Sequence, residues 1–295
     1  MSELDLTVDG IDIAVTHSDK VLFGASGITK GDLARYFERI GPTMLPHVRG
    51  RPMTLVRHPN GIDGQGFFQK NTPDHYPDWI PRVGLDKKDG VVHHCVVDRT
   101  AALVYFAQQN VITPHIGLAR TDDLDHPDRF VVDLDPSVDD FDQVRRVALG
   151  VREALVGVGL VPFVQLTGSK GLHVVVPLDR SAAWSDAERF GHALSSLLLQ
   201  RFPDDLTMQF SKSKRGDSIY LDMGRNGYQA TIAAPYGVRA YEGAPVVTPI
   251  EWGELDEPGI TSRRYTIATV FDRLDAHGDA WAAMADSARP LPRPR

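Results

Sequence analysis

The sequence predicts an α+β fold in which two mixed or antiparallel sheets are flanked by helices. Strand-like and helical hydrophobic periods alternate along the chain, and several neighbouring strands are joined by short turns. Short turns connect antiparallel strands, whereas parallel neighbours need a longer crossover connection. No internal repeat is visible. A doubly wound parallel sheet is therefore disfavoured.

Capping and periodicity signals define the elements of the first half. Thr29 is placed to cap a helix over about 30–39, and Pro42 and Pro46 are expected to end it. The other elements expected here are strand-like alternation over 1–15, a strand over 53–57, a turn-rich segment over 58–64, a long surface loop over 72–89, a helix over 99–110 capped by Asp98, and a strand over 111–116.

The second half alternates strands and helices around a glycine-containing turn. The expected elements are a strand over 129–136, a helix over about 140–158 closed by Gly159, strands over 162–167 and 172–177 joined by the turn 168–171, a helix ending near Phe202, and strands over 218–223 and 229–235. Ser185 and Glu188 match a capping box for the second of these helices.

One domain is expected over residues 1–287. We divide it into an N-terminal lobe over about 1–115 and a catalytic core over about 116–287. Residues 288–295 alternate proline with arginine and leucine, a pattern typical of an extended chain, so a disordered tail is expected there.

Composition indicates a soluble globular protein. The 295 residues are 42% hydrophobic and 24% charged, without an apolar run near 18 residues or a secretory leader, so a membrane span is disfavoured and a cytoplasmic location is expected. A single cysteine, Cys95, excludes an internal disulfide framework and a multi-cysteine zinc site. Its apolar surroundings favour a buried hydrophobe over a nucleophile.

Charge is concentrated in two regions of opposite sign. Residues 120–142 hold nine aspartates and two arginines, a net charge of −7, which equals that of the whole chain. Residues 20–58 hold seven lysines and arginines against two acidic residues. The acidic region favours hard divalent cations, and the basic region favours a phosphate-rich substrate.

Three aspartates on apolar strands form the expected catalytic centre. Asp133 and Asp135 lie two residues apart in a hydrophobic strand and therefore point to the same face, and Asp222 stands in a second apolar strand. Three such carboxylates suit two Mg²⁺ or Mn²⁺ ions in phosphoryl transfer. The alternatives are a solvated acidic loop for the pair, and a salt bridge to Arg215 or Arg225 for Asp222.

The turn Thr167-Gly168-Ser169-Lys170-Gly171 supplies hydroxyls, a cation and open backbone N–H groups to an anion such as a triphosphate. It lacks the spacing of a P-loop, and an ordinary hairpin turn is the alternative. His115 and His173 flank this region in the sequence, and a structural role is the alternative for each.

Several separated motifs, in one order, resemble the polymerase domain of bacterial DNA ligase D, a member of the archaeo-eukaryotic primase superfamily. The matching segments are Asp19 to Phe23, Thr29-Lys30, Arg51-Pro52, Pro59 to Gly61, Phe67 to Lys70, Asp133 to Asp135, Thr167 to His173, Asp222, and Ala234 to Arg239. The resemblance extends from about Thr16 to about Leu274. It implies a primase-polymerase core related to the RRM fold.

The resemblance also implies a template-dependent nucleotidyltransferase that fills DNA ends and short gaps, prefers ribonucleotides and uses two Mn²⁺ or Mg²⁺ ions. Asp133, Asp135 and Asp222 would be catalytic metal ligands. The implied nucleotide-binding residues are His115, Thr167, Ser169, Lys170, Arg215 and Arg239. The implied DNA-binding residues are His17, Lys20, Lys30, Arg57, Phe67, Phe68 and Lys70, with Lys20 and Lys30 matching a 5′-phosphate pocket and the phenylalanines matching template-stacking aromatics.

Two positions depart from the family pattern, in which Asn often replaces His17 and Ser often replaces Thr167. His17 would add pH dependence to end recognition, and Thr167 keeps a hydroxyl but crowds the sugar. The expected role is DNA break repair by non-homologous end joining, in a stand-alone form associated with the nucleoid. Ku and a separate DNA ligase are candidate partners. A non-catalytic DNA-end module and a metal-dependent phosphoesterase are the alternatives.

Overall fold

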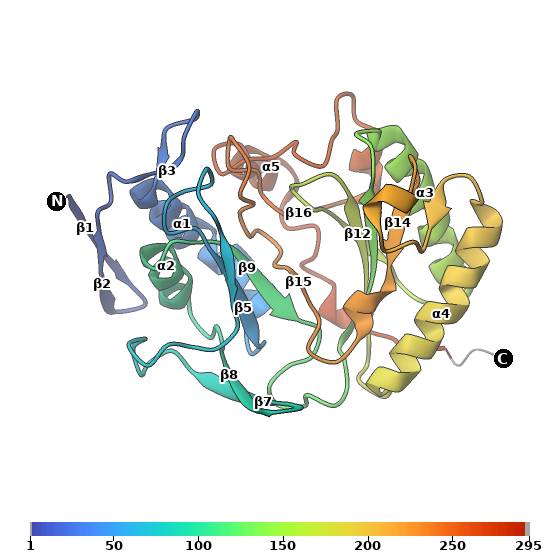
Figure 1. The fold of residues 1–295 in the computed structure, drawn as a ribbon, viewed down its shortest axis with the longest axis horizontal. Helices are drawn as coiled ribbons and strands as arrows, with labels where there is room; N and C mark the ends of the chain where they lie inside the picture. The colour runs from blue at the N-terminus through green and yellow to red at the C-terminus, as the bar shows by residue number, and fades with distance from the viewer. Residues whose placement is uncertain (1, 293–295) are drawn as a thin grey trace. The chain divides into compact units, whose positions relative to one another are not determined.

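The computed structural model describes residues 2–292, which form two compact units (Figure 1). The first unit holds the described residues through Asp122 together with Thr231–Val247 and Tyr265–Arg273; the second holds Asp123–Ala230, Thr248–Arg264 and the residues from Leu274 onward. The first unit thus extends past the lobe boundary predicted near residue 115, and it also includes two segments from later in the chain. The first of these segments pairs as a strand with His115–Gly117, and an isolated bridge between Pro245 and Thr266 joins the second segment to the first. No local signal encodes such contacts.

The first unit contains a four-stranded sheet, three hairpins and two packed helices. Within the described residues its elements are β1 (Glu3–Val8), β2 (Ile11–Thr16), β3 (Val21–Phe23), β4 (Ile28–Thr29), α1 (Lys30–Val48), β5 (Met53–Arg57), β6 (Phe67–Gln69), β7 (Arg82–Lys87), β8 (Gly90–Cys95), α2 (Thr100–Gln108), β9 (Val111–Gly117) and β15 (Thr231–Ala233). The sheet order is β15-β9-β5-β6, with antiparallel neighbours. Gly41 lets α1 and α2 approach closely, because a Cβ there would meet Thr100 Cγ2 at 2.1 Å.

The second unit is built on a six-stranded mixed sheet of order β13-β14-β10-β12-β11-β16. Its described elements are β10 (Arg129–Pro136), α3 (Phe141–Gly157), β11 (Phe163–Leu166), β12 (Leu172–Pro177), α4 (Trp184–Arg201), β13 (Leu206–Thr207), η1 (Lys212–Lys214), β14 (Ile219–Asp222), η2 (Met223–Asn226), β16 (Thr248–Ile250), η3 (Trp252–Asp256) and η4 (Ala285–Ser287). A further helix, α5 (Val270–His277), begins in the first unit and ends in the second.

Helices α3 and α4 pack together beside this sheet, as Figure 1 shows in green and yellow. Phe130 of β10 packs edge-to-face on Phe190 of α4 with ring centroids 5.1 Å apart. Successive side chains of a strand point to opposite faces, so Phe130, Val132 and Leu134 point to the helices and the alternate residues point away. The fold class predicted from the sequence, α+β with mixed and antiparallel sheets, is confirmed.

Helix α1 continues through both prolines that were expected to end it, so that prediction is wrong. The predicted cap is present, because Thr29 Oγ1 accepts a hydrogen bond from Asp32 N at 3.1 Å. Pro42 and Pro46 are exposed, so the rings of both prolines lie on the solvent side of the helix. Met44 and Val48, one turn apart, are fully buried, so packing of this face extends the helix.

Two other predicted caps are placed differently. Asp98 pairs with Arg99, and the N-terminus of α2 is satisfied by Asp9, whose Oδ2 accepts from Ala101 N at 2.9 Å. Helix α4 begins earlier than Ser185 and Glu188 indicate: Asp186 accepts a hydrogen bond from Ala183 N at 3.1 Å. A cap supplied from 92 residues away is invisible to a local pattern.

The predicted surface loop over 72–89 contains a strand. β7 and β8 form an antiparallel hairpin in which Arg82 lies opposite Cys95 and Lys87 opposite Gly90. Gly90 has a φ of 127°, a conformation that favours glycine, and the Asp89-Gly90 pair was the available turn signal. Cys95 is buried, as expected.

The C-terminal segment is packed through Pro292, contrary to the expected disorder from residue 288. Arg289 N donates to Pro177 O at 3.3 Å, and Leu291 is buried. An apolar leucine between prolines supplies the contact. Residues 293–295 lie outside the described part of the chain. Among the described residues no helix has both the length and the apolar character needed to cross a membrane.

Candidate functional site

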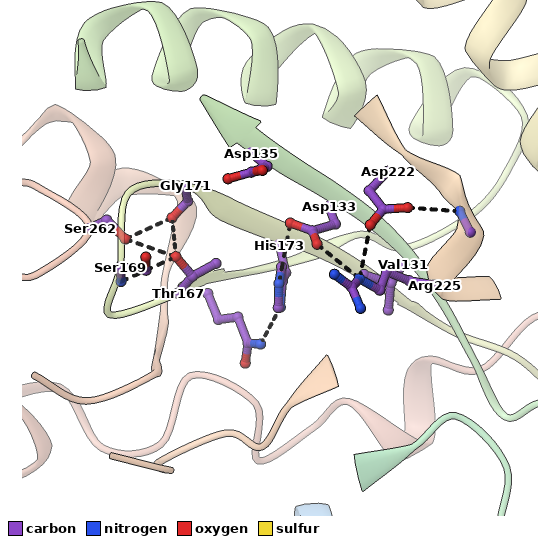
Figure 2. Close-up of polar contacts among 12 residues, drawn as sticks. Val131, Asp133, Asp135, Thr167, Ser169, Gly171, His173, Asp222, Arg225 and Ser262 are labelled. Carbon is purple, nitrogen blue, oxygen red and sulfur yellow. Dashed lines mark hydrogen bonds and ion pairs between the residues drawn. The ribbon is translucent and has the colours of Figure 1, made fainter. Parts of the chain in front are cut away.

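Three aspartates share one face in the middle of the six-stranded sheet. Asp133 on β10 lies directly opposite Asp222 on β14, and on its other side it lies opposite His173 on β12. Asp135, two residues further along β10, points to the same face (Figure 2). The strand pairing therefore gathers carboxylates that are 89 positions apart in the chain, from Asp133 to Asp222.

Arg225 lies against two of these carboxylates. Its Nε is 3.3 Å from Asp133 Oδ2 and 3.1 Å from Asp222 Oδ2 (Figure 2). From the sequence, Arg215 and Arg225 were the two possible salt-bridge partners of Asp222, and Arg225 is the one observed. It does not remove the case for a cation site, because the guanidinium itself shows that the paired carboxylates attract positive charge.

Arg215 is held rigidly beside the third aspartate. Its Nη1 donates to Asp135 Oδ2 at 3.1 Å, and its other nitrogens donate to the backbone carbonyls of Gln209 at 3.0 Å and Phe210 at 2.8 Å. The guanidinium also stacks on the ring of Tyr220 at 4.1 Å. A buried arginine with so many partners presents a fixed positive charge next to Asp135.

The two opposed carboxylates have pKa values shifted in opposite directions. Burial acts to raise the pKa of Asp133, but His173 and Arg225 outweigh it and the pKa is lowered. Burial raises the pKa of Asp222; Arg225 opposes this effect, and the negative charges of Asp133 and Asp135 add to it. Asp133 has His173 as an additional partner, which explains why it is the more readily ionised of the two.

His173 is oriented by a buried glutamine. Its Nδ1 lies 2.8 Å from Gln165 Nε2, and its Nε2 lies 3.4 Å from Asp133 Oδ1. If the amide nitrogen donates to Nδ1, the imidazole proton is on Nε2 and points at the carboxylate. Gln165 is fully buried on the neighbouring strand β11, opposite His173 in register. His173 was a candidate from the sequence, whereas Gln165 was not predicted.

The glycine-containing turn packs directly against the aspartate strand. A Cβ at Gly171 would lie 1.8 Å from the Leu134 carbonyl oxygen, so only glycine permits this approach. Thr167 is buried, and its hydroxyl donates to Gly171 O at 3.0 Å and lies 3.0 Å from Ser262 Oγ. Ser262, which was not predicted from the sequence, therefore helps Thr167 to shape the turn.

The exposed part of this turn is formed by its middle residues. Lys170 is exposed, and Ser169 O accepts a hydrogen bond from Arg263 Nε at 2.8 Å. Gly168 has a φ of 64° and donates its N–H to Ser262 O at 3.0 Å. The turn thus carries an exposed lysine and, through Gly171, packs against the strand that carries Asp135.

A second group of possible metal ligands lies elsewhere in the second unit. Among the described residues, ligand atoms of Glu254, Glu257 and His277 lie within 4.8 Å of one another. Glu254 Oε1 accepts a hydrogen bond from Glu251 N at 2.6 Å and so caps η3. Glu254 lies in η3, Glu257 directly follows η3, and His277 ends α5; this group was not predicted from the sequence.

The first unit carries an exposed aromatic pair. Phe67 and Phe68 of β6 are 44% and 64% exposed, and Phe68 packs edge-to-face on His115 with centroids 5.6 Å apart. Arg57 is fixed beside them, donating to Gln109 O at 2.8 Å. Exposed aromatic rings next to cationic and imidazole groups are suited to stack on nucleobases.

The predicted nucleotide ligands His115 and Arg239 both lie in the first unit. His115 is on β9, between Thr54 of β5 and Ala233 of β15 in register. Arg239 lies in the segment after β15, where its N–H donates to Pro245 O at 2.8 Å. Lys70 follows β6 and is exposed.

Lys20 and Lys30 are held by backbone carbonyls. Lys30 Nζ donates to Thr16 O at 2.8 Å, and Lys20 Nζ donates to Pro59 O. Burial, together with the charges of Lys20 and Arg57, lowers the pKa of Lys30 to about 8. His17 lies next to Thr16 in the chain, with a φ of 52°. Lys20, Lys30 and Arg57 thus form a local positive field, in which Lys30 is buried. No carboxylate is among the causes of the shift in the Lys30 pKa.

Comparison with known proteins identifies the family. The family model of the LigD primase-polymerase domain matches residues 29–281. The multifunctional non-homologous end joining protein LigD of Mycolicibacterium smegmatis is 32% identical over 275 residues, which cover 92% of this chain and 36% of the relative. The bifunctional LigD of Bacillus subtilis is 29% identical over 265 residues, covering 89% of this chain and 42% of the relative. The chain thus spans less than half the length of these relatives.

A solved structure agrees with the sequence comparison. The polymerase domain of Mycobacterium tuberculosis ligase D, in complex with DNA, superposes with a TM-score of 0.87 and 31% identity, covering 94% of this chain and 99% of that one. The family resemblance inferred from separated motifs is confirmed. By fold and by sequence, this chain belongs to the LigD primase-polymerase domain family of nucleotidyltransferases.

Proposed function

We propose that this protein is a template-dependent polymerase that adds nucleotides at DNA ends and short gaps during non-homologous end joining. The single observation that supports it most is the gathering of Asp133, Asp135 and Asp222 on one sheet face beside the Thr167–Gly171 turn. The relatives named for end joining, and a related domain bound to DNA, support the pathway and the substrate. Ribonucleotide preference, Ku and a separate ligase as partners, and a place at the nucleoid remain predictions.

The three aspartates suit divalent cations. They offer carboxylate oxygens, the donors that Mg²⁺ and Mn²⁺ take, and a guanidinium already lies on two of them. We propose that Asp133, Asp135 and Asp222 hold two such ions. When bound, they supply positive charge to the phosphoryl group being transferred and to the oxygens that attack and leave.

The cationic side chains supply the remaining charge complementarity. Lys170 on its exposed turn and the rigid Arg215 are assigned to the triphosphate, because both offer donors to anionic oxygens. His115 and Arg239 are assigned to the incoming nucleotide on the family resemblance. Lys20 and Lys30 are assigned to the 5′-phosphate of the DNA together with His17, which lies three residues before Lys20 in the chain. Arg57 is assigned to DNA binding.

The direct test is extension of a labelled primer in a gapped, 5′-phosphorylated duplex with each ribo- and deoxynucleotide, in Mn²⁺ or Mg²⁺. Template-directed growth by one or a few nucleotides is the expected result. The same gel measures the choice of sugar and of metal. Shortening of the primer would instead favour a phosphoesterase, and binding without extension would favour a non-catalytic DNA-end module.

Raising the pH from about 7 to about 9 is expected to weaken the preference for 5′-phosphorylated gaps. The pKa of Lys30 is lowered to about 8, so its amine is charged below that pH and neutral above it. Fluorescence anisotropy with phosphorylated and unphosphorylated gapped duplexes measures the ratio of affinities. Lys30→Met should flatten the pH profile, because the group that loses its charge near pH 8 is then absent. If the ratio of affinities still falls with rising pH in the Lys30→Met variant, this assignment is wrong.

Phe68→Ala is expected to weaken binding of the template strand about tenfold with little change in stability. A stacked base contributes roughly 1–3 kcal/mol, and the ring is 64% exposed, so its removal leaves no core cavity. Binding of a duplex with an unpaired template base measures the effect. Phe68→Leu, which keeps apolar bulk without the ring, should behave like the alanine variant; full binding by the leucine variant would show that stacking is not required.

A further inference from the structure

Asp133 and Asp222 face each other at directly opposite positions of an antiparallel strand pair. Like charges in this arrangement destabilise the pair. Both side chains are largely buried, with 13% and 18% of their surface exposed. Two ionised carboxylates in such a place need a cation between them, or one must take up a proton.

Arg225 supplies a cation to both carboxylates in the structure. A single nitrogen, Nε, lies within 3.3 Å of Asp133 Oδ2 and 3.1 Å of Asp222 Oδ2 (Figure 2). It thereby uses one carboxylate oxygen from each aspartate. Those are oxygens that a divalent ion bound by the pair would compete for.

The backbone next to Arg225 is anchored while its side chain is accessible. The Asn226 side chain, which is buried, donates to Val131 O at 2.7 Å and accepts from Val131 N at 2.8 Å, and this pins η2 to β10. The Arg225 side chain itself is 42% exposed. It can therefore turn into solvent without breaking the contacts that hold η2.

We propose that Arg225 is a displaceable stand-in for the divalent cation. It offsets part of the negative charge of Asp133 and Asp222 in the metal-free protein and withdraws when an ion takes their oxygens. This inference rests on the proposed function, because the ion belongs to nucleotidyl transfer. Since a guanidinium and a metal ion use the same lone pairs, Arg225 sets the affinity for the metal by competing with it.

The test is a direct titration of the nucleotide-free protein with Mn²⁺. The electron paramagnetic resonance signal of free Mn²⁺ measures how much of the ion is bound. Arg225→Met is expected to tighten binding about three- to tenfold, the effect of removing one partly exposed competing ion pair. Arg189→Met is the matched control. Arg189 pairs with Asp186 at the same three-residue spacing on α4, so its loss should leave Mn²⁺ binding unchanged.

Thermal unfolding supplies a second measurement. Without metal, Arg225→Met should melt below the wild-type protein, because the opposed carboxylates lose their counter-charge. Mn²⁺ should then raise the melting temperature more in the variant than in the wild type, since the ion replaces the missing charge. Arg225→Gln, which keeps a polar head, is the second variant if the methionine protein does not fold, and the same tightening is expected.

Two outcomes separate this inference from the proposed function. If Asp133→Asn abolishes Mn²⁺ binding but Arg225→Met leaves it unchanged or weaker, the site stands and competition by Arg225 is wrong. If the wild-type protein binds Mn²⁺ no better than Asp133→Asn does, the proposed metal site itself is wrong, and the inference fails with it.

Discussion

Asp135→Ala is expected to slow nucleotide addition by about a hundredfold or more while leaving affinity for gapped DNA nearly unchanged. The carboxylate is 49% exposed on the sheet face, so it contributes charge to the site rather than packing to the core. Arg215 keeps its bonds to the carbonyls of Gln209 and Phe210, and the fold around it should persist. Single-turnover primer extension with Mn²⁺, beside DNA binding by anisotropy, measures both quantities.

Asp139→Ala is the matched control for this prediction. Asp139 belongs to the same acidic segment but is exposed and lies beyond the end of β10. Its removal changes the local field by the same charge without touching the strand face. Normal extension by the Asp135 variant, or equal loss in both variants, would show that a specific carboxylate at position 135 is not required.

Gly171→Ala is expected to lower the free energy of unfolding by about 3 kcal/mol, a large effect for one methyl group. The new Cβ would lie 1.8 Å from Leu134 O and 3.1 Å from Pro136 Cδ. Neither atom belongs to a flexible side chain, so the turn or β10 must move, and the pairing of Leu134 with Leu172 is strained. Urea denaturation measures the loss, and extension activity should fall with it.

Gly157→Ala provides the comparison. A Cβ at Gly157, the last residue of α3, meets no heavy atom within 4 Å. Stability should therefore stay the same or rise by up to about 1 kcal/mol, because alanine loses less backbone entropy in a helix. A Gly171 variant as stable as this one would contradict the close approach of the turn to the aspartate strand.

Several features of the site were predictable because they depend on neighbours in the sequence. Alternation along a strand places Asp133 and Asp135 on one face, and Thr29, directly before a helical pattern, caps α1 by accepting from Asp32 N. Each depends on residues two to four positions apart, where backbone geometry is decisive. The resemblance to the family depended in addition on the order of the separated motifs along the chain.

Other features were not predictable because they join distant segments. Asp9 caps α2, and the prolines inside α1 are tolerated because the opposite face of the helix is buried. Ser262 bonds to Thr167 across 95 positions. No local pattern records which distant oxygen will reach a given donor, because this depends on how whole elements pack.

The sequence by itself determined the acidic strand, the glycine-containing turn and the class of fold, because hydrophobic period and turn chemistry act over a few residues. Only the tertiary structure decided that Asp222 lies opposite Asp133, that Arg225 lies on both, and that β15 returns to the first unit. Register between distant strands is selected by burial of the entire core, a sum over many contacts that no single segment contains.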